Sequence, residues 1–345
     1  MSIQKHVGIA GVGIYLPEDY ITAQDISNET GGTWTEAAVM EKLGITRKTI
    51  PGTSDGTQEM GFKAALNCIT ENNLDPLEID LVICIGEEWK EYPLTTSAIY
   101  IQEKLGAYNA YGFDLQQRCC TCITAMKVAK DMLLSDDALN TVLICGGYRN
   151  GDFIDYNNSK VSFMFNLAAG GGAIVLKKNY GRNELLETSI ISDGSFSRDV
   201  GVRYGGTENP ITSDNFSMAY KSLDVFDVQG MKQRLNEKST PNFLKVIRNA
   251  LEKSGYTEKA LNYLAMLHFK YSAHLYMLQE LGLTEKNSIY LREYGHIGQI
   301  DQILSLKLGL EAGKIKDGDL VATVAAGIGY AWAANVIKWG PIATA

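Results

Sequence analysis

Residues 110–133 constrain this chain most, because they join a short apolar strand to a helical pattern and place cysteines at the junction. Residues 110–115 predict a strand, and an apolar stripe at helical spacing follows. Cys119, Cys120 and Cys122 lie between the two. A cysteine at such a junction lies near the free N–H groups of a helix N-terminus, which stabilise a thiolate and can hold an oxyanion on an attached acyl group. The pattern therefore predicts a nucleophile at the start of a helix.

The clustered cysteines have two other interpretations. A metal site is disfavoured, because the Cys-Cys-x-Cys pattern lacks a second Cys/His pair at zinc-like spacing. A role as small core residues is favoured for every cysteine except Cys119, since free cysteine is often buried. Those core candidates are Cys68, Cys84, Cys120, Cys122 and Cys145. We expect free thiols in a reducing cytoplasm rather than a disulfide framework.

Composition narrows the class of protein. The chain has 345 residues, of which 45% are hydrophobic, so it can bury a large core. Its net charge of −8 argues against nucleic acid or an anionic membrane as the main partner. Since no apolar run approaches the roughly 20 residues that span a bilayer, membrane insertion is not expected. The N-terminal segment reads as a first strand rather than a signal peptide, and we expect a cytoplasmic protein.

Strand and helix patterns alternate along the chain and predict a mostly parallel, helix-covered sheet. The order of elements is similar in two halves, residues 1–178 and 179–345. In the second half, Thr240 as N-cap and Pro241 at the first position predict a helix over 241–254. Further helices are predicted over 55–73, 95–105, 272–281 and 298–310. Strands are predicted over 6–15, 81–86, 110–115, 141–147, 168–176, 184–192, 261–267, 320–325 and 331–339.

Two histidines lie at strand or helix junctions. His268 follows the buried strand pattern NYLAML, and ligands bind at that end of strands in open α/β sheets. His296 lies in a turn, EYGHIGQ, before a helix, so it occupies in the second half roughly the place of Cys119 in the first. Either could be an ordinary structural histidine. A cysteine with histidine partners distant in sequence is, however, the pattern of an activated thiol nucleophile.

These motifs, in this order, resemble the thiolase-fold condensing enzymes, specifically the 3-oxoacyl-(acyl carrier protein) synthase III group. The segments GFDLQQRC with Cys119, LAMLH with His268, KLGITRKTI and the closing GDLVATVAAGIGYAWAANVIKW carry the resemblance along the whole chain. It implies an α/β thiolase fold with two βαβαβαββ halves in an α-β-α-β-α sandwich. It also implies a homodimer that uses acyl-CoA or acyl carrier protein thioesters, with no separate cofactor and no metal.

The resemblance further implies a mechanism for lipid, fatty acid or polyketide-type biosynthesis. Cys119 takes an acyl group from a thioester, and an oxyanion hole forms from its own N–H and one N–H in the turn from Gly327 to Gly329. His268 and His296 bind the thioester carbonyl of a malonyl-type substrate, which decarboxylates and attacks the acyl group to give a 3-oxoacyl product. Basic residues near Trp34 would hold the phosphate end of the pantetheine arm, namely Lys42, Arg47 and Lys48.

The chain departs from the family pattern around the nucleophile and the second histidine. His296 stands where the family has Asn, the bulky Arg118 precedes Cys119, and Asn166–Ala173 reads NLAAGGGA in place of GDGAGA. These departures suggest a specialised substrate. They also leave open a non-condensing subunit that supports an active partner, and an acyltransferase that delivers the acyl group to oxygen or nitrogen.

The segment GEEWKEY after the second strand is similar to 3-hydroxy-3-methylglutaryl-CoA synthases, in which a Glu after the Gly acts as general acid/base. Glu88 is the candidate, and it would make condensation without decarboxylation an alternative reaction. A base of this kind needs burial. Glu91 and Tyr92 are candidates to line the active site of a partner subunit. The other interpretation is a solvated, charged turn.

Overall fold

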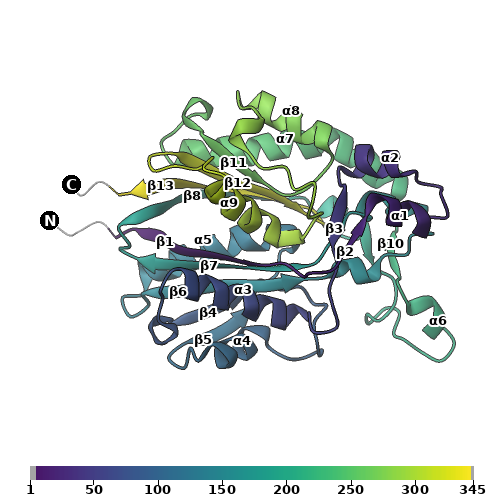
Figure 1. Ribbon diagram of the computed structural model, residues 1–345, viewed down its shortest axis with the longest axis horizontal. Helices are drawn as coiled ribbons and strands as arrows, with labels where there is room; N and C mark the ends of the chain where they lie inside the picture. The colour runs from purple at the N-terminus through teal and green to yellow at the C-terminus, as the bar shows by residue number, and fades with distance from the viewer. Residues whose placement is uncertain (1–4, 343–345) are drawn as a thin grey trace.

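The computed structural model describes residues 5–342, and the nine strands predicted from the sequence all lie in one central sheet (Figure 1). These strands are β1 (Val7–Tyr15), β4 (Leu81–Cys84), β5 (Tyr111–Asp114), β6 (Thr141–Tyr148), β7 (Gly170–Lys178), β8 (Arg182–Ser192), β11 (Tyr263–Met266), β12 (Leu320–Gly327) and β13 (Ala331–Pro341). Their order across the sheet is β11-β12-β13-β8-β1-β7-β6-β4-β5. The predicted ends of the two halves, residues 1–4 and 343–345, lie outside the described residues.

The prediction of a mostly parallel sheet is wrong. Only β4 with β5, β4 with β6, and β11 with β12 pair in parallel within the described chain. The strands in the middle of the sheet, from β6 through β7, β1 and β8 to β13 and β12, pair antiparallel. The short turn after β12 joins it to its antiparallel neighbour β13, whereas a parallel neighbour would need a long crossover connection.

The sheet consists of two parts that meet at a single register pair, Gly8 with Glu184. Helices α3 (Thr57–Glu71) and α4 (Ser97–Leu105) pack on the first part, and α7 (Val228–Lys253) packs on the second. Helices α5 (Thr121–Ser135) and α9 (Asp301–Glu311) contact strands of both parts and lie between them (Figure 1). This gives the predicted α-β-α-β-α layers and brings the N-termini of two central helices together. The division at residue 178 stays a prediction.

Helix α7 begins thirteen residues earlier than the sequence indicated, at Val228 rather than Pro241. Its N-cap is Asp227, whose carboxylate accepts a hydrogen bond from Gly230 N at 2.9 Å. Pro241 lies inside the helix on an exposed face. The polar first half buries little beyond Met231, so it lacks the apolar stripe by which a helix is recognised.

Smaller elements gather at one end of the molecule (Figure 1). Two two-stranded sheets are formed by β2 (Tyr20–Thr22) with β3 (Arg47–Thr49) and by β9 (Val200–Val202) with β10 (Leu223–Val225). The short helices there are α1 (Ala23–Glu29), α2 (Glu36–Ala38) and α6 (Phe216–Ala219), and α6 projects outward. Helix α8 (Tyr271–Glu280) comes directly after β11 in the chain. None of the helices in the described residues has the length and apolar character needed to cross a membrane.

Candidate active site

Cys119 and His296 meet between the two central helices. Cys119 lies in the 3₁₀ turn η3 (Arg118–Cys120), which leads directly into α5, and it is 6% exposed. His296 lies just before the 3₁₀ turn η9 (Gly298–Ile300), which leads into α9. Its Nε2 is 3.3 Å from Cys119 Sγ. The two junctions that the sequence singled out are therefore in direct contact.

Asp301 completes the pair, and the sequence analysis missed it. His296 Nδ1 is 2.5 Å from Asp301 Oδ2, and the carboxylate has no exposed surface. The same carboxylate accepts hydrogen bonds from the backbone N–H groups of Ile297 at 2.8 Å and His268 at 2.7 Å. The available signal was an acidic residue at the first position of the helix that follows GHI, a place where carboxylates are common for capping reasons alone.

The electrostatics of the pair favour a proton on His296. Burial alone would lower the pKa of His296, but the Asp301 carboxylate and the Cys119 sulfur overcome it and raise the pKa well above its ordinary value. Asp301 accepts from Nδ1, so the neutral ring carries its proton there and leaves Nε2 free to take the thiol proton. Cys119, His296 and Asp301 thus have the geometry of an activated thiol nucleophile with an oriented base.

The turn that carries His296 is fixed by its backbone and by a glycine. His296 N donates to Asn166 O at 2.8 Å, and Ala168 N donates to His296 O at 2.9 Å. Gly298 has a φ of +56°, and a Cβ there would lie 2.4 Å from the ring of the buried Tyr148. Only glycine fits this turn, which lets α9 start immediately beside His296.

His268 is near the pair but does not present a free donor. Its Nε2 donates to Leu43 O at 2.9 Å, and its Nδ1 is buried without a partner. Burial lowers the pKa of His268 to about 4, so the ring is neutral at pH 7 and its Nδ1 is an acceptor. His268 therefore presents an acceptor, and not a free N–H, at Nδ1, and its role as a donor to a substrate carbonyl stays a prediction. Its membership of the site stays a prediction.

The structure corrects the acidic candidate from Glu88 to Glu87. The Glu88 side chain is 68% exposed, so it lacks the burial that a base needs. Glu87 is 4% exposed at its side chain, and burial raises its pKa. Both carboxylates pair with Arg118, at 2.7 Å from Glu87 and 3.0 Å from Glu88. The sequence could not separate the adjacent glutamates, because β4 ends at Cys84 and is buried on both faces, so it offers no alternation to extend to them.

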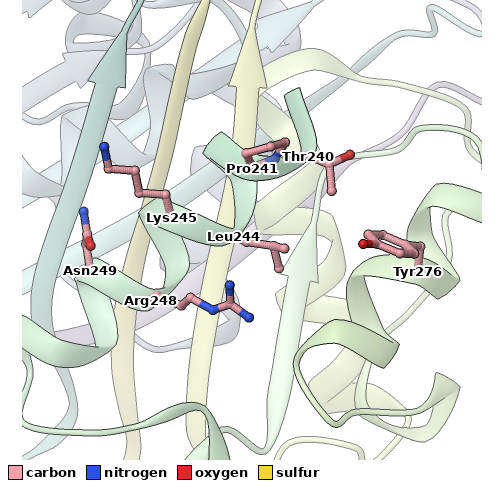
Figure 2. A pocket seen from close by; sticks show the side chains of 7 residues that line it. All are labelled: Thr240, Pro241, Leu244, Lys245, Arg248, Asn249 and Tyr276. Carbon is pink, nitrogen blue, oxygen red and sulfur yellow. The ribbon is translucent and has the colours of Figure 1, made fainter. Parts of the chain in front are cut away.

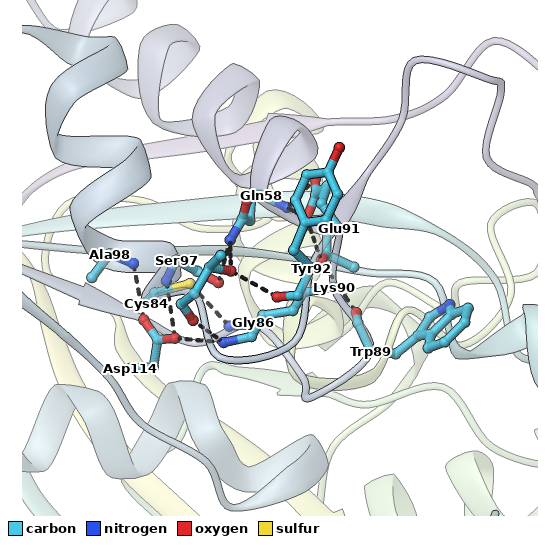
Figure 3. Close-up of polar contacts among 12 residues, drawn as sticks. Gln58, Cys84, Gly86, Trp89, Lys90, Glu91, Tyr92, Ser97, Ala98 and Asp114 are labelled. Atoms are coloured by element: carbon cyan, nitrogen blue, oxygen red, sulfur yellow. Dashed lines mark hydrogen bonds and ion pairs between the residues drawn. The ribbon is translucent and has the colours of Figure 1, made fainter. Parts of the chain in front are cut away.

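Glu91 has a structural role in its own subunit, and its assignment to the pocket of a partner subunit stays a prediction. Its carboxylate accepts from the backbone N–H groups of Gln58 at 2.9 Å and Glu59 at 3.2 Å, so it caps α3 (Figure 3). The N-cap residue of α3, Gly56, has no side chain to do so. Tyr92 is 71% exposed and points away from this network, and its assignment stays a prediction (Figure 3).

The same loop is tied at its other end through Asp114. The Asp114 carboxylate accepts from Ser97 N at 3.0 Å and Ala98 N at 2.9 Å, and it pairs with Lys90 at 3.2 Å (Figure 3). Trp89 donates to Asp152 at 3.0 Å. These contacts fix the part of the loop that follows Glu87.

The turn proposed for the oxyanion hole packs against the nucleophile. A Cβ at Gly327 would lie 3.2 Å from Cys119 N and 2.8 Å from Gln117 O, so the two backbones are in close contact. Gly329, with a φ of +113°, lies in the turn between β12 and β13. Their role as oxyanion donors stays a prediction.

The residues proposed for the rim of the pantetheine site have different surroundings in the structure. Lys42 Nζ lies 5.6 Å from the centre of the Trp34 ring, so these two are together. Arg47 pairs with Glu293 at 3.1 Å and stacks on Tyr20, and its role at a rim stays a prediction. Lys48 is wrong as a rim residue, because it is 1% exposed and its Nζ donates to the carbonyls of residues 165 and 167, both at 2.7 Å.

The remaining cysteines are buried free thiols, which confirms that interpretation. In the described residues, no cluster of three or more His, Cys, Asp or Glu side chains could hold a metal ion. A surface groove of about 550 Å³ lies beside α7 and α8 (Figure 2). None of the candidate catalytic residues lines it; its walls are Thr240, Pro241, Leu244, Lys245, Arg248, Asn249 and Tyr276.

Comparison with known proteins identifies the family. The family model of 3-oxoacyl-(acyl carrier protein) synthase III matches residues 113–194, and the model of the C-terminal part of that family matches residues 251–339. The β-ketoacyl-(acyl carrier protein) synthase III of Prochlorococcus marinus subsp. pastoris is 30% identical, covering 98% of this chain and 98% of that protein. The synthase III of Synechocystis is 26% identical over 96% of this chain and 97% of its own.

Solved structures confirm the fold. The synthase III from Thermus thermophilus has a TM-score of 0.82 at 23% identity, covering 97% of this chain and all of that one. The priming β-ketosynthase of the R1128 polyketide pathway has a TM-score of 0.82 at 20% identity, covering 99% of each chain. With 30% identity to a curated relative over 98% of its length, the chain belongs to the 3-oxoacyl-(acyl carrier protein) synthase III family of thiolase-fold condensing acyltransferases.

Proposed function

We propose that this protein loads an acyl group from an acyl-CoA or acyl carrier protein thioester onto Cys119 and condenses it with a malonyl-type thioester to give a 3-oxoacyl product. The observation that carries the proposal is the contact series Cys119 Sγ, His296 Nε2 and Asp301, at 3.3 Å and 2.5 Å. The names of the curated relatives support the same reaction.

In the loading step, Cys119 transfers its proton to His296 Nε2, and the thiolate attacks the thioester carbonyl. The imidazolium is stabilised by the buried Asp301 carboxylate. The oxyanion forms beside the N–H of Cys119 and the Gly327–Gly329 turn. When the tetrahedral intermediate collapses, the departing thiolate takes the proton from Nε2, leaving acyl-Cys119 and a free thiol.

In the condensing step, a malonyl-type thioester loses CO2, and its enolate attacks the acyl-Cys119 carbonyl. The carbon–sulfur bond to Cys119 then breaks, which releases the 3-oxoacyl product and returns the Cys119 thiolate. The enolate oxygen needs a hydrogen-bond donor. His296 supplies Nε2–H when it regains a proton, which its raised pKa favours. His268 Nε2 is engaged with Leu43 O, so His296 is the donor available from this pair of histidines.

A second candidate is transfer of the acyl group to a hydroxyl or an amine. The observation that favours it is the Asp301-held His296, because a neutral ring in this tautomer accepts the proton of an attacking O–H or N–H. The engagement of His268 with Leu43 also favours it, since such a transfer needs no second donor to an enolate.

The two reactions differ in the required protonation state of His296, so one experiment separates them. Acyl-Cys119 enzyme would be mixed with malonyl-CoA, malonyl-acyl carrier protein or a panel of alcohols and amines, while product mass and CO2 release are recorded across pH. Condensation predicts a 3-oxoacyl product with CO2 release that slows as pH rises. A product ester or amide without CO2, formed faster as pH rises, would instead establish transfer.

A homodimer and a cytoplasmic location are part of the proposal. Strand β5 is at the edge of the sheet and pairs only with β4 among the described strands. Exposed apolar side chains lie near this edge, including Tyr108 at 64% and Tyr111 at 53%. An unpaired edge beside aromatic surface suits pairing with a second copy. Sedimentation velocity would test this, and a concentration-independent monomer would contradict it.

A further inference from the structure

Arg118, the residue before the nucleophile, is held in an uncommon backbone conformation. Its φ is +52°, in the left-handed region that residues with a Cβ rarely occupy. Such a conformation persists only where surrounding contacts fix it, and these sites are often functional. The side chain is 40% exposed, so the guanidinium lies at the boundary between solvent and the buried nucleophile.

Two glutamates hold the guanidinium in unequal ways. Nη1 donates to Glu87 at 2.7 Å, and the Glu87 side chain is 4% exposed. Nη2 donates to Glu88 at 3.0 Å, and the Glu88 side chain is 68% exposed. A buried, charge-assisted bond is strong, whereas an exposed ion pair contributes little. Glu87 therefore anchors Arg118, and Glu88 occupies a position that another carboxylate could take at little cost.

The anchor lies beside the reacting groups. The charge of His296 lowers the pKa of Glu87, and the charge of Glu87 raises that of Tyr148, whose ring centre is 6.3 Å from that of His296. His296 in turn is 3.3 Å from Cys119 Sγ. Arg118 directly precedes Cys119 in the turn η3, and its guanidinium is fixed to Glu87 beside these groups.

We propose that Arg118 binds a free carboxylate on the acyl group that Cys119 accepts, and that this carboxylate displaces Glu88. The acyl donor would then be a thioester of a dicarboxylic acid of the malonyl or succinyl type. The inference rests on the proposed loading of Cys119. Planar guanidinium donors suit a carboxylate, and a carboxylate held this way is stabilised against loss as CO2, because decarboxylation moves its charge away from the guanidinium.

The test compares acylation of Cys119 by donors matched in size, malonyl-CoA with butyryl-CoA and succinyl-CoA with pentanoyl-CoA. Rates are followed by single-turnover intact-protein mass spectrometry. Arg118→Met is expected to lower the ratio of carboxylate-donor to neutral-donor rates by roughly 10- to 100-fold, the effect of losing a hydrogen bond between charged groups. Glu88→Gln is expected to raise the same ratio, because it removes the competing carboxylate. Glu103→Gln, which removes an exposed charge on α4, is the matched control.

The outcomes are separable. An unchanged ratio in both Arg118→Met and Glu88→Gln, in enzyme that still loads acyl groups, would overturn the carboxylate site and leave the proposed function standing. The Glu88 variant keeps this test valid if Arg118→Met misfolds, since Glu88 is exposed. The variants could also alter only the reaction of malonyl-CoA with preloaded acyl-Cys119 and leave the loading rates unchanged. That result would overturn the carboxylate site as well, because Arg118 would then bind the malonyl substrate of the condensing step and not the loaded acyl group. Failure of every donor to acylate the wild type would overturn both proposals.

Discussion

Replacing Asp301 with asparagine should disable the base without removing it. The carboxylate accepts three N–H groups, from His296 Nδ1, His268 N and Ile297 N. An amide has one oxygen and an NH2 group, so at least one of these donors must face another donor. If the amide NH2 turns toward His296, the ring is forced into the tautomer with its proton on Nε2, and it can no longer accept a proton from Cys119.

The expected magnitude follows from that geometry. Leaving a buried N–H without an acceptor costs about 1–3 kcal/mol of folding stability, so the variant should still fold. Loss of the oriented base should slow acylation by roughly 100- to 10,000-fold, the range for general-base loss and for the same exchange in a Ser-His-Asp triad. The pKa of His296 should fall, because the Asp301 carboxylate is what raises it against burial.

Two assays check this prediction, acylation of Cys119 by mass spectrometry and alkylation by iodoacetamide as a function of pH. Asp75→Asn serves as the control, because Asp75 is an exposed carboxylate that accepts one backbone N–H at the start of a 3₁₀ turn. If Asp301→Asn acylates within about threefold of the wild type and keeps its alkylation profile, Asp301 has no part in activating the thiol.

Three further predictions concern buried or capping groups. Burial lowers the pKa of His274 to about 4, below the ordinary value near 6.5, so stability should be lost as pH falls through that interval. The wild type should lose about 2 kcal/mol more than His274→Phe between pH 7 and pH 5 in urea unfolding, and equal losses would contradict this. Burial lowers the pKa of Lys48 from its ordinary value to about 7, so the stability that Lys48 contributes rises with pH. The free energy of unfolding of the wild type, relative to that of Lys48→Met, should therefore increase by about 2 kcal/mol between pH 7 and pH 9. A constant difference between the two proteins would show that the pKa of the amine is not shifted. Glu91→Ala should cost about 1 kcal/mol of stability through the lost cap on α3 and leave acylation intact, and a loss of turnover without a loss of stability would favour a role in a partner's site.

The sequence was sufficient to find the nine strands and the two junctions that meet at the site. Each junction has a local signature, an apolar strand or turn followed by a helical stripe, so Cys119 and His296 could be identified without knowing the fold. The parallel or antiparallel pairing of the strands could not be predicted, because the apolar pattern of a strand shows which residues are buried and not the direction in which the strand runs. The start of α7 was missed because its first half is polar and Pro241 gives a strong local signal.

The partners of the junction residues depend on contacts between distant segments. Asp301 is one acidic residue among many, and its role follows from packing that brings its carboxylate to His296 and to the N–H of His268. The engagement of His268 with Leu43, more than 200 residues away, has no local signature. The choice between Glu87 and Glu88 depends on how an irregular loop turns after β4, which neighbouring contacts decide.

The central claim is that Cys119 is the residue that carries the acyl group. Intact-protein mass spectrometry of the wild type and Cys119→Ala, after incubation with a panel of acyl-CoA and acyl carrier protein thioesters, tests it most directly. We predict one acyl adduct on the wild type and none on the variant, because Cys120 and Cys122 are buried and burial raises the pKa of both. An adduct of the same mass that persists in Cys119→Ala would contradict the account.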